Sequence, residues 1–175
     1  MIIHPQIQGC VARNCHPIGC RAAVQQQIAR VKAAGSFNGP RRVLVLGASS
    51  GFGLASRIAL TFGAGGDRLG ISFERGPSDK GLGSAGWYND IWFREAAEQE
   101  GRIAIKSARH PLIDKNKVVP TDLYLGSDFD ALIVTGPKAR DLMQKVSPNY
   151  ISNSHQPIAP AREIEVGMGL ARAHR

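Results

Sequence analysis

Short apolar runs alternate along the chain with segments that have the period of a helix. Residues 43–46 are four consecutive apolar residues, as in a strand buried on both faces, and residues 54–62 follow with helical spacing. Residues 69–73 repeat the strand pattern, and further strand candidates lie at 102–106 and 130–135. Strands that alternate with helices predict an α/β fold with a parallel sheet.

A helix is also predicted ahead of the first strand, over residues 21–34. Val24, Ile28 and Val31 stand at positions i, i+4 and i+7, which places them on one helical face. Residues 16–19, which contain a proline and a glycine, are expected to form a turn before this helix.

A third helix is predicted over residues 90–100, opened by the aromatic segment 87–89. Trp87 and Trp92 are interpreted as packing residues and not as ligand-stacking residues. One plausible buried stripe on this helix consists of four apolar residues: Ile91, Trp92, Ala96 and Ala97.

The turn between the first strand and its helix is the most informative segment for function. It reads GASSGFG over residues 47–53. A glycine at Gly47 lets the chain leave the strand in a conformation that side chains disfavour. Gly51 has no Cβ, so a pyrophosphate group has room to approach the backbone, and Gly53 lets the helix pack closely on the strand. The N–H groups and dipole of the helix start favour an anion there.

An acidic residue follows the second predicted strand. Glu74 stands about 20 residues past the glycines, where a carboxylate usually bonds the ribose hydroxyls of NAD(H) and repels the 2′-phosphate of NADP(H). Arg75 leaves NADP(H) as an alternative cofactor, because an arginine can bind the 2′-phosphate. The alternative is an ordinary strand–turn–helix corner without a ligand.

These patterns predict an incomplete Rossmann-like parallel sheet with flanking helices and a partly irregular C-terminal tail. We expect residues 1–106 to form the dinucleotide-binding region and residues 107–136 to add a further strand or strands. Residues 137–175 are expected to be loop-rich or disordered, since 147–160 is rich in Pro, Ser and Asn.

Composition narrows the classes of protein. The apolar fraction of 43% is enough for a core, and no apolar run is long enough to span a bilayer. No secretory signal is visible, so a cytoplasmic protein is expected. The net charge of +8 is dispersed, which suits an anionic cofactor or an acidic carrier protein and does not favour nucleic acid. The oligomeric state stays open.

The three cysteines, Cys10, Cys15 and Cys20, lie five positions apart with His4 and His16 nearby. This spacing differs from the C-x2-C of zinc sites, and an odd number argues against a disulfide framework. Reduced thiols without a metal are expected.

Several motifs together resemble the FabV-type trans-2-enoyl-CoA and enoyl-acyl-carrier-protein reductases over residues 1–101. The matching pieces are MII at the start, HPIGC at 16–20, the glycine segment at 38–58, the pair FE at 73–74 and AGWYN at 85–89. The resemblance implies a Rossmann-type sheet and NADH-dependent reduction of the 2,3 double bond of an enoyl thioester, a step of fatty acid biosynthesis. It implies a turn that cradles the pyrophosphate and a pair that holds the adenosine end. The implied cofactor-binding residues are Gly47, Ala48, Ser49, Ser50, Gly51, Phe52, Gly53, Phe73 and Glu74.

The catalytic pair of that family, a tyrosine and a lysine spaced Y-x8-K, has no counterpart in these 175 residues. The residues nine positions after the three tyrosines are Ala97, Ile133 and Ala159. Hydride delivery to an enoyl thioester builds an enolate that needs a positioned proton donor. We therefore assign no catalytic residue and expect the isolated chain to be inactive.

Residues 107–137 weakly resemble the segment that precedes the phosphate loop of MutS-type ATPases, with RHPL near its start and TGP at its end. The G-x-x-x-x-G-K-[ST] loop itself is absent after Gly136. Two resemblances that meet near residue 106 suggest a fused, truncated or frame-altered chain. The leading function is thus the NADH-binding portion of an enoyl thioester reductase. The alternatives are a non-catalytic dinucleotide-binding module and a fragment of a DNA-repair ATPase.

Overall fold

The computed structural model divides the chain into two compact units, Met1–Val134 and Thr135–Arg175, each of which is described by itself. The residues that the structure describes are 2–4, 6–9, 11–12, 14–79, 81–102, 104–107, 113–114, 117–118, 130–136, 138–152, 161–166 and 169–173. Among these residues, no helix combines the length and the apolar character that crossing a membrane requires.

The first unit is built on a four-stranded parallel sheet. Its strands lie in the order β5 (Ala104–Ser107), β4 (Asp67–Ile71), β3 (Arg42–Leu46) and β8 (Ala131–Val134). The register aligns Leu44 of β3 with Leu69 on one side and Leu132 on the other. The chain therefore starts in the middle of the sheet, moves outward through β4 and β5, and returns to the other side of β3. The Rossmann-like α/β prediction is confirmed.

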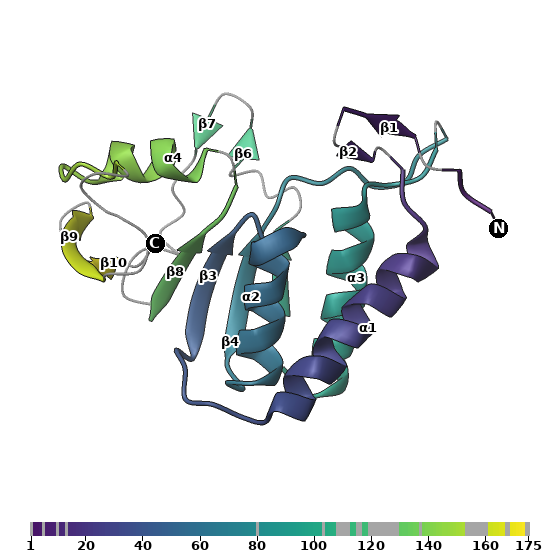
Figure 1. Cartoon of the computed structure of the whole chain (residues 1–175), viewed down its shortest axis with the longest axis horizontal. Helices are drawn as coiled ribbons and strands as arrows, with labels where there is room; N and C mark the ends of the chain where they lie inside the picture. The colour runs from purple at the N-terminus through teal and green to yellow at the C-terminus, as the bar shows by residue number, and fades with distance from the viewer. Residues whose placement is uncertain are drawn as a thin grey trace. The chain divides into compact units, whose positions relative to one another are not determined.

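Three helices pack together beside this sheet, as Figure 1 shows: α1 (Pro17–Ala34), α2 (Gly51–Phe62) and α3 (Ala85–Gln99). Val24 and Ile28, two of the three residues predicted for the inner face of α1, are buried in their common core, and Val31 is packed against it. Other members of this core are Leu54, Ile58, Phe93 and Ala97. A second cluster, Val43, Val45 and Ala48, packs with Leu60 of α2 between helix and sheet.

Two short antiparallel hairpins complete the described part of the unit. They are β1 (Ile7–Gln8) with β2 (Val11–Ala12), and β6 (Ile113–Asp114) with β7 (Lys117–Val118).

Two sequence-based boundaries were wrong for identifiable reasons. The predicted turn at 16–19 is the start of α1, because Pro17 suits the first helical position and the His16 side chain accepts the N–H of Gly19 at 3.2 Å. The second strand covers residues 67–71 and not 69–73, since its register with β3 pairs Arg42 with Asp67 and Leu46 with Ile71. Phe73 and Glu74 consequently lie in the loop after the strand.

The predicted buried stripe on α3 was partly wrong. Phe93 is fully buried, Ile91 is only half-buried, and Asp90 lies on the buried face. The packing interpretation of Trp92 agrees with the structure, in which Trp92 packs against the core and its Nε1 donates to the Pro17 carbonyl at 3.1 Å. The inward side of α3 therefore carries the charged Asp90 and differs from the predicted apolar stripe.

Asp90 forms an ion pair with Arg57 of α2 inside the first unit. The Nη1–Oδ1 distance is 2.7 Å, and the two side chains are 1% and 0% exposed. Ser72 donates to the other carboxylate oxygen at 2.9 Å, and the guanidinium lies 4.2 Å from the centroid of the Phe93 ring. Burial lowers the pKa of the Arg57 guanidinium, and the Asp90 charge opposes that shift. This pair joins α2, α3 and the segment after β4 at one point.

The second unit contains α4 (Ala139–Val146) and an antiparallel hairpin of β9 (Arg162–Val166) and β10 (Gly169–Ala173). Gln144 of α4 accepts the N–H of Ile151 at 2.9 Å, and Asn149 accepts the N–H of Glu165 at 2.7 Å. Neither element was predicted: α4 is only eight residues long, and three of the five residues of β9 are charged, namely Arg162, Glu163 and Glu165. Residues 153–160 of the expected loop lie outside the described residues.

The buried ion pair predicts a large stability difference between two substitutions on α3. Asp90→Ala leaves the Arg57 guanidinium without its partner and is expected to lower the free energy of unfolding by about 3–5 kcal/mol. The control Glu98→Ala removes an exposed partner of Arg94 on the same helix and is expected to cost about 0.5 kcal/mol or less. Urea unfolding followed by circular dichroism measures both, and equal losses would show that the buried pair is not a stabilising constraint.

Candidate cofactor-binding site

The glycine turn joins the carboxyl end of β3 to the start of α2. Gly47 has a φ of +80°, a left-handed conformation that favours glycine. The N–H groups of Gly47 and Ala48 donate to the carbonyl of Ile71 at 2.9 and 3.2 Å, which holds the turn against the end of β4. The predicted strand–turn–helix geometry is therefore present.

The residues predicted to bind a cofactor divide into an exposed and a buried set. Gly47, Ser50, Gly51 and Phe52 are exposed, whereas three others face the interior of the unit: Ala48, Ser49 and Gly53. The exposed set is placed to meet a ligand. The buried set lies in the turn and at the start of α2, where Gly53 is one of the buried residues of the helix.

The space above Gly51 suits an approaching phosphate group. Gly51 has a φ of +53°, and within the described part of the chain an added Cβ there would meet no atom within 4 Å. Ser50 is the residue that precedes α2, and its side chain makes no capping hydrogen bond. The first N–H groups of a helix have no partner within the helix, so an anion can accept from them. The turn thus fits a pyrophosphate.

The Glu74 carboxylate accepts hydrogen bonds from two serine hydroxyls, one in the glycine turn and one at the start of α3. Ser49 Oγ donates to one carboxylate oxygen, and Ser84 Oγ, which directly precedes α3, donates to the other. A carboxylate has about four acceptor positions, so it retains capacity for a further donor. Phe73, beside it, is 75% exposed and Phe52 is 85% exposed. Two exposed aromatic rings and a carboxylate are therefore available in the segments predicted for the adenosine end and the turn.

Sequence reasoning missed the contribution of the start of α3 to this site. A Cβ on Gly86 would overlap the Glu74 carboxylate, so only glycine leaves that position free for it. Asn89 Nδ2 donates to the carbonyl of Ser49 at 3.0 Å and holds the turn from the side of α3. Gly86 and Asn89 lie in the AGWYN segment, and Ser84 directly precedes it; the segment had served as a family motif without assigned roles.

The thiols near the site are reduced in this structure. Cys15 and Cys20 form no disulfide, and Cys15 Sγ donates to the Gly83 carbonyl at 3.5 Å. Burial raises the pKa of the Cys15 thiol and raises that of Cys20 to about 11, which disfavours the reactive thiolates. Cys10 lies outside the described residues.

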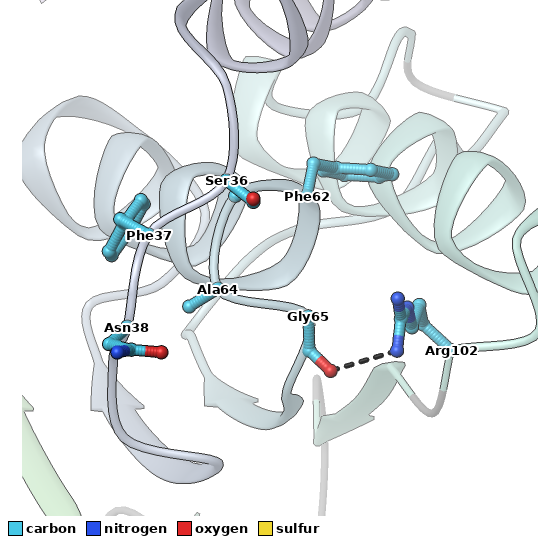
Figure 2. A pocket seen from close by; sticks show the side chains of 8 residues that line it. Ser36, Phe37, Asn38, Phe62, Ala64, Gly65 and Arg102 are labelled. Carbon is cyan, nitrogen blue, oxygen red and sulfur yellow. Dashed lines mark hydrogen bonds between the residues drawn. The ribbon is translucent and has the colours of Figure 1, made fainter.

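A cavity of about 460 Å³ lies at the other end of the strands (Figure 2). Its walls come from the segments that precede β3, β4 and β5, and the residues that line it are Ser36, Phe37, Asn38, Phe62, Gly63, Ala64, Gly65 and Arg102. Arg102, the charged residue of this cavity, donates to the Gly65 carbonyl at 2.8 Å. Ligands of open α/β sheets bind at the carboxyl ends of strands, so the exposed glycine turn is the better candidate despite its open shape.

The fold and the turn define a dinucleotide-binding α/β unit. Comparison with known proteins shows which dinucleotide-binding domains this unit is similar to. Residues 2–79 match the model of the NAD(P)H binding domain of trans-2-enoyl-CoA reductase. The chain is 66% identical over 107 residues to enoyl-[acyl-carrier-protein] reductase [NADH] 2 of Vibrio vulnificus, covering 60% of this chain and 27% of the relative. It is 46% identical over 169 residues to the corresponding reductase of Vibrio cholerae, covering 92% of this chain and 42% of the relative.

Solved structures show a similarity to the same class of reductase. Trans-2-enoyl-CoA reductase of Clostridium acetobutulicum in complex with NADH has a TM-score of 0.64 and 27% identity, covering 99% of this chain and 46% of that chain. The enzyme of Treponema denticola in complex with NAD has a TM-score of 0.56 and 41% identity, covering 61% of this chain and 28% of that chain. Residues 2–79 are thus similar to the NAD(P)H binding domain of trans-2-enoyl-CoA reductase, and the chain is similar to enoyl reductases solved with NAD or NADH. It spans less than half the length of these relatives.

The extent of the similarity differs between relatives: the Vibrio vulnificus alignment covers 60% of the chain and the Vibrio cholerae alignment covers 92%. An alignment that covers 92% of the chain necessarily includes residues 107–137, which the sequence analysis compared with MutS-type ATPases. The longer alignment extends across this segment, and the ATPase comparison has no support.

The hydrogen bond from Asn89 to the Ser49 carbonyl leads to a prediction for a variant that lacks it. Asn89→Ala leaves the Ser49 carbonyl without this donor and is expected to lower the free energy of unfolding by about 0.5–1.5 kcal/mol. Hydrogen exchange is expected to accelerate at residues 47–53 more than in the core of α1. Asn38→Ala in the distant cavity is the control and should leave exchange in the turn unchanged. Unchanged exchange in Asn89→Ala would contradict the role given to this amide.

Proposed function

We propose that this chain is the NADH-binding portion of an enoyl thioester reductase that acts on trans-2-enoyl groups carried by coenzyme A or acyl carrier protein. The observation that carries the proposal is the exposed, open glycine turn at the carboxyl end of β3, with Glu74 bonded to the same turn. The enoyl reductases to which the chain is similar supply the reaction class.

The topology supports this position for the cofactor. β3 lies between β4 and β8, so the connections that leave and return to it run to opposite sides. Such a switch point opens a crevice at the carboxyl ends of the strands, where dinucleotides bind in open α/β sheets. The turn at residues 47–53 stands at this edge.

Different residues of the chain contact different parts of the cofactor in this proposal. Gly47, Ser50, Gly51 and Phe52 offer exposed backbone to the pyrophosphate, while Ala48, Ser49 and Gly53 hold the shape of the turn. Phe73 offers an exposed ring to the adenine, and Glu74 offers its carboxylate to the adenosine ribose. A carboxylate at that place disfavours a 2′-phosphate, in agreement with the NAD(H) found with the structural relatives.

NADH supplies a hydride when bound. The chain itself binds and orients the dinucleotide, but its 175 residues contain no Y-x8-K pair to protonate an enolate. We therefore propose that the isolated chain binds NADH without reducing an enoyl thioester. In that state it behaves as a dinucleotide-binding module, the second function left open by the sequence. A cytoplasmic location remains part of the proposal, as does an acyl carrier protein partner, whose acidic surface would suit the net charge of +8.

Titration separates binding from turnover. NADH fluorescence is expected to report saturable binding to the purified chain, and adding crotonyl-CoA, a short enoyl thioester, is expected to cause no loss of absorbance at the NADH band. ATP serves as the control nucleotide and should not compete, because the chain has no Walker-type loop after Gly136. Steady oxidation of NADH would contradict the proposed inactivity, and absence of binding would contradict the proposed function.

A matched pair of glycine variants tests the turn. Gly51 and Gly101 both have left-handed backbone, with φ of +53° and +67°, and an added Cβ at either would meet no atom within 4 Å in the described structure. Alanine is expected to cost about 1–2 kcal/mol of folding free energy at either position. Only Gly51→Ala is expected to weaken NADH binding, by about tenfold or more, because its methyl group occupies the approach to the pyrophosphate. Equal affinities of the two variants would show that the turn is only structural.

A further inference from the structure

Glu74 stands outside the sheet, yet its side chain has one defined position. It follows the end of β4 by three residues, so no strand pairing orients it. Ser49 Oγ holds one carboxylate oxygen and Ser84 Oγ holds the other. The carboxylate is therefore fixed from two sides, by the glycine turn and by the start of α3.

Ser84 is itself held in place by hydrogen bonds of its backbone. Its N–H donates to the Arg75 carbonyl at 2.9 Å, which closes the loop that follows Glu74. Its carbonyl accepts the N–H of Trp87 at 3.1 Å in the first turn of α3. The preceding residue, Gly83, donates to the buried Tyr88 hydroxyl at 3.2 Å. A hydroxyl anchored in this way places the carboxylate more definitely than a mobile loop residue would.

Gly86 leaves free the space that the Glu74 carboxylate occupies. It is buried, and any Cβ at this position would overlap both carboxylate oxygens of Glu74. A larger residue at position 86 would therefore displace the carboxylate even with Ser84 intact.

We propose that Ser84 and Gly86 are positioning residues that fix the Glu74 carboxylate and thereby set the preference of the site for NADH over NADPH. The inference rests on the proposed function, in which Glu74 meets the adenosine ribose. A fixed carboxylate accepts from the ribose hydroxyls and repels a 2′-phosphate that enters the same space. A carboxylate that has lost one anchor can turn away from the phosphate, so its discrimination between the two cofactors falls.

The test measures dissociation constants of NADH and NADPH by fluorescence, with the complete 175-residue chain. In Ser84→Ala the ratio of the NADPH constant to the NADH constant is expected to fall about three- to tenfold, the range that one lost hydrogen bond gives. Ser84→Thr retains the hydroxyl and should keep the ratio within about twofold of the unmodified chain. Ser36→Ala, at the opposite end of the strands, is the matched serine control with an unchanged ratio.

Two further variants test whether the ratio of the dissociation constants depends on the position and on the charge of the Glu74 carboxylate. Gly86→Ala is expected to lower the ratio through a weaker NADH affinity, and Glu74→Gln is expected to lower it through the loss of charge. Thermal melting establishes that each variant is folded, and Ser84→Ala, which only removes an oxygen, keeps the test decisive if Gly86→Ala unfolds.

The outcomes separate the inference from the function on which it rests. If Glu74→Gln lowers the ratio and Ser84→Ala does not, the positioning role is overturned and the proposed function stands. If Ser84→Ala weakens both cofactors equally, its role is merely structural and the inference is overturned. If Glu74→Gln leaves the ratio unchanged, the ribose role proposed for Glu74 fails, and the positioning role fails with it.

Discussion

The ion pair between Arg57 and Asp90 is the constraint on which the first unit depends. Two full charges with 1% and 0% exposure are tolerated only where they are paired and hydrogen-bonded. The pair therefore determines the rotation of α2 and α3 about their own axes, since turning either helix would leave one charge alone in the core. Gly70 of β4 lies against the guanidinium, where a Cβ would overlap it, so the sheet also makes room for this pair.

The same constraint reaches the glycine turn. Asn89 follows from the orientation of Asp90, because adjacent helical residues point about 100° apart, and its amide holds the Ser49 carbonyl. Ser49 in turn donates to Glu74. A buried pair in the core is in this way connected, through one helix and one turn, to the carboxylate proposed to meet the cofactor. The site is consequently rigid where it faces inward and open where it faces outward.

Sequence patterns predicted the parts of this arrangement that repeat locally. Alternation of residues 43–46 with a helical segment indicated a parallel sheet, and the glycines of the turn indicated its ligand class. The same reasoning placed β4 two residues late, because Phe73 continues the alternation of Leu69 and Ile71 although pairing with β3 ends at Ile71. Boundaries of this kind depend on the partner strand, and single-strand periodicity contains no information on it.

Contacts between distant segments were beyond such patterns. Ser84 and Ser49 are 35 positions apart in the chain, and only the fold brings both hydroxyls to Glu74. Arg57 and Asp90 did leave a signal, since each interrupts an otherwise apolar helical face: Leu54, Ile58 and Thr61 on α2, and Gly86, Phe93 and Ala97 on α3. Charges of opposite sign on two buried faces of neighbouring helices have few arrangements other than pairing with each other. The pairing seen in the structure brings one turn of α2 against one turn of α3, and it thereby places the start of α3 beside the glycine turn.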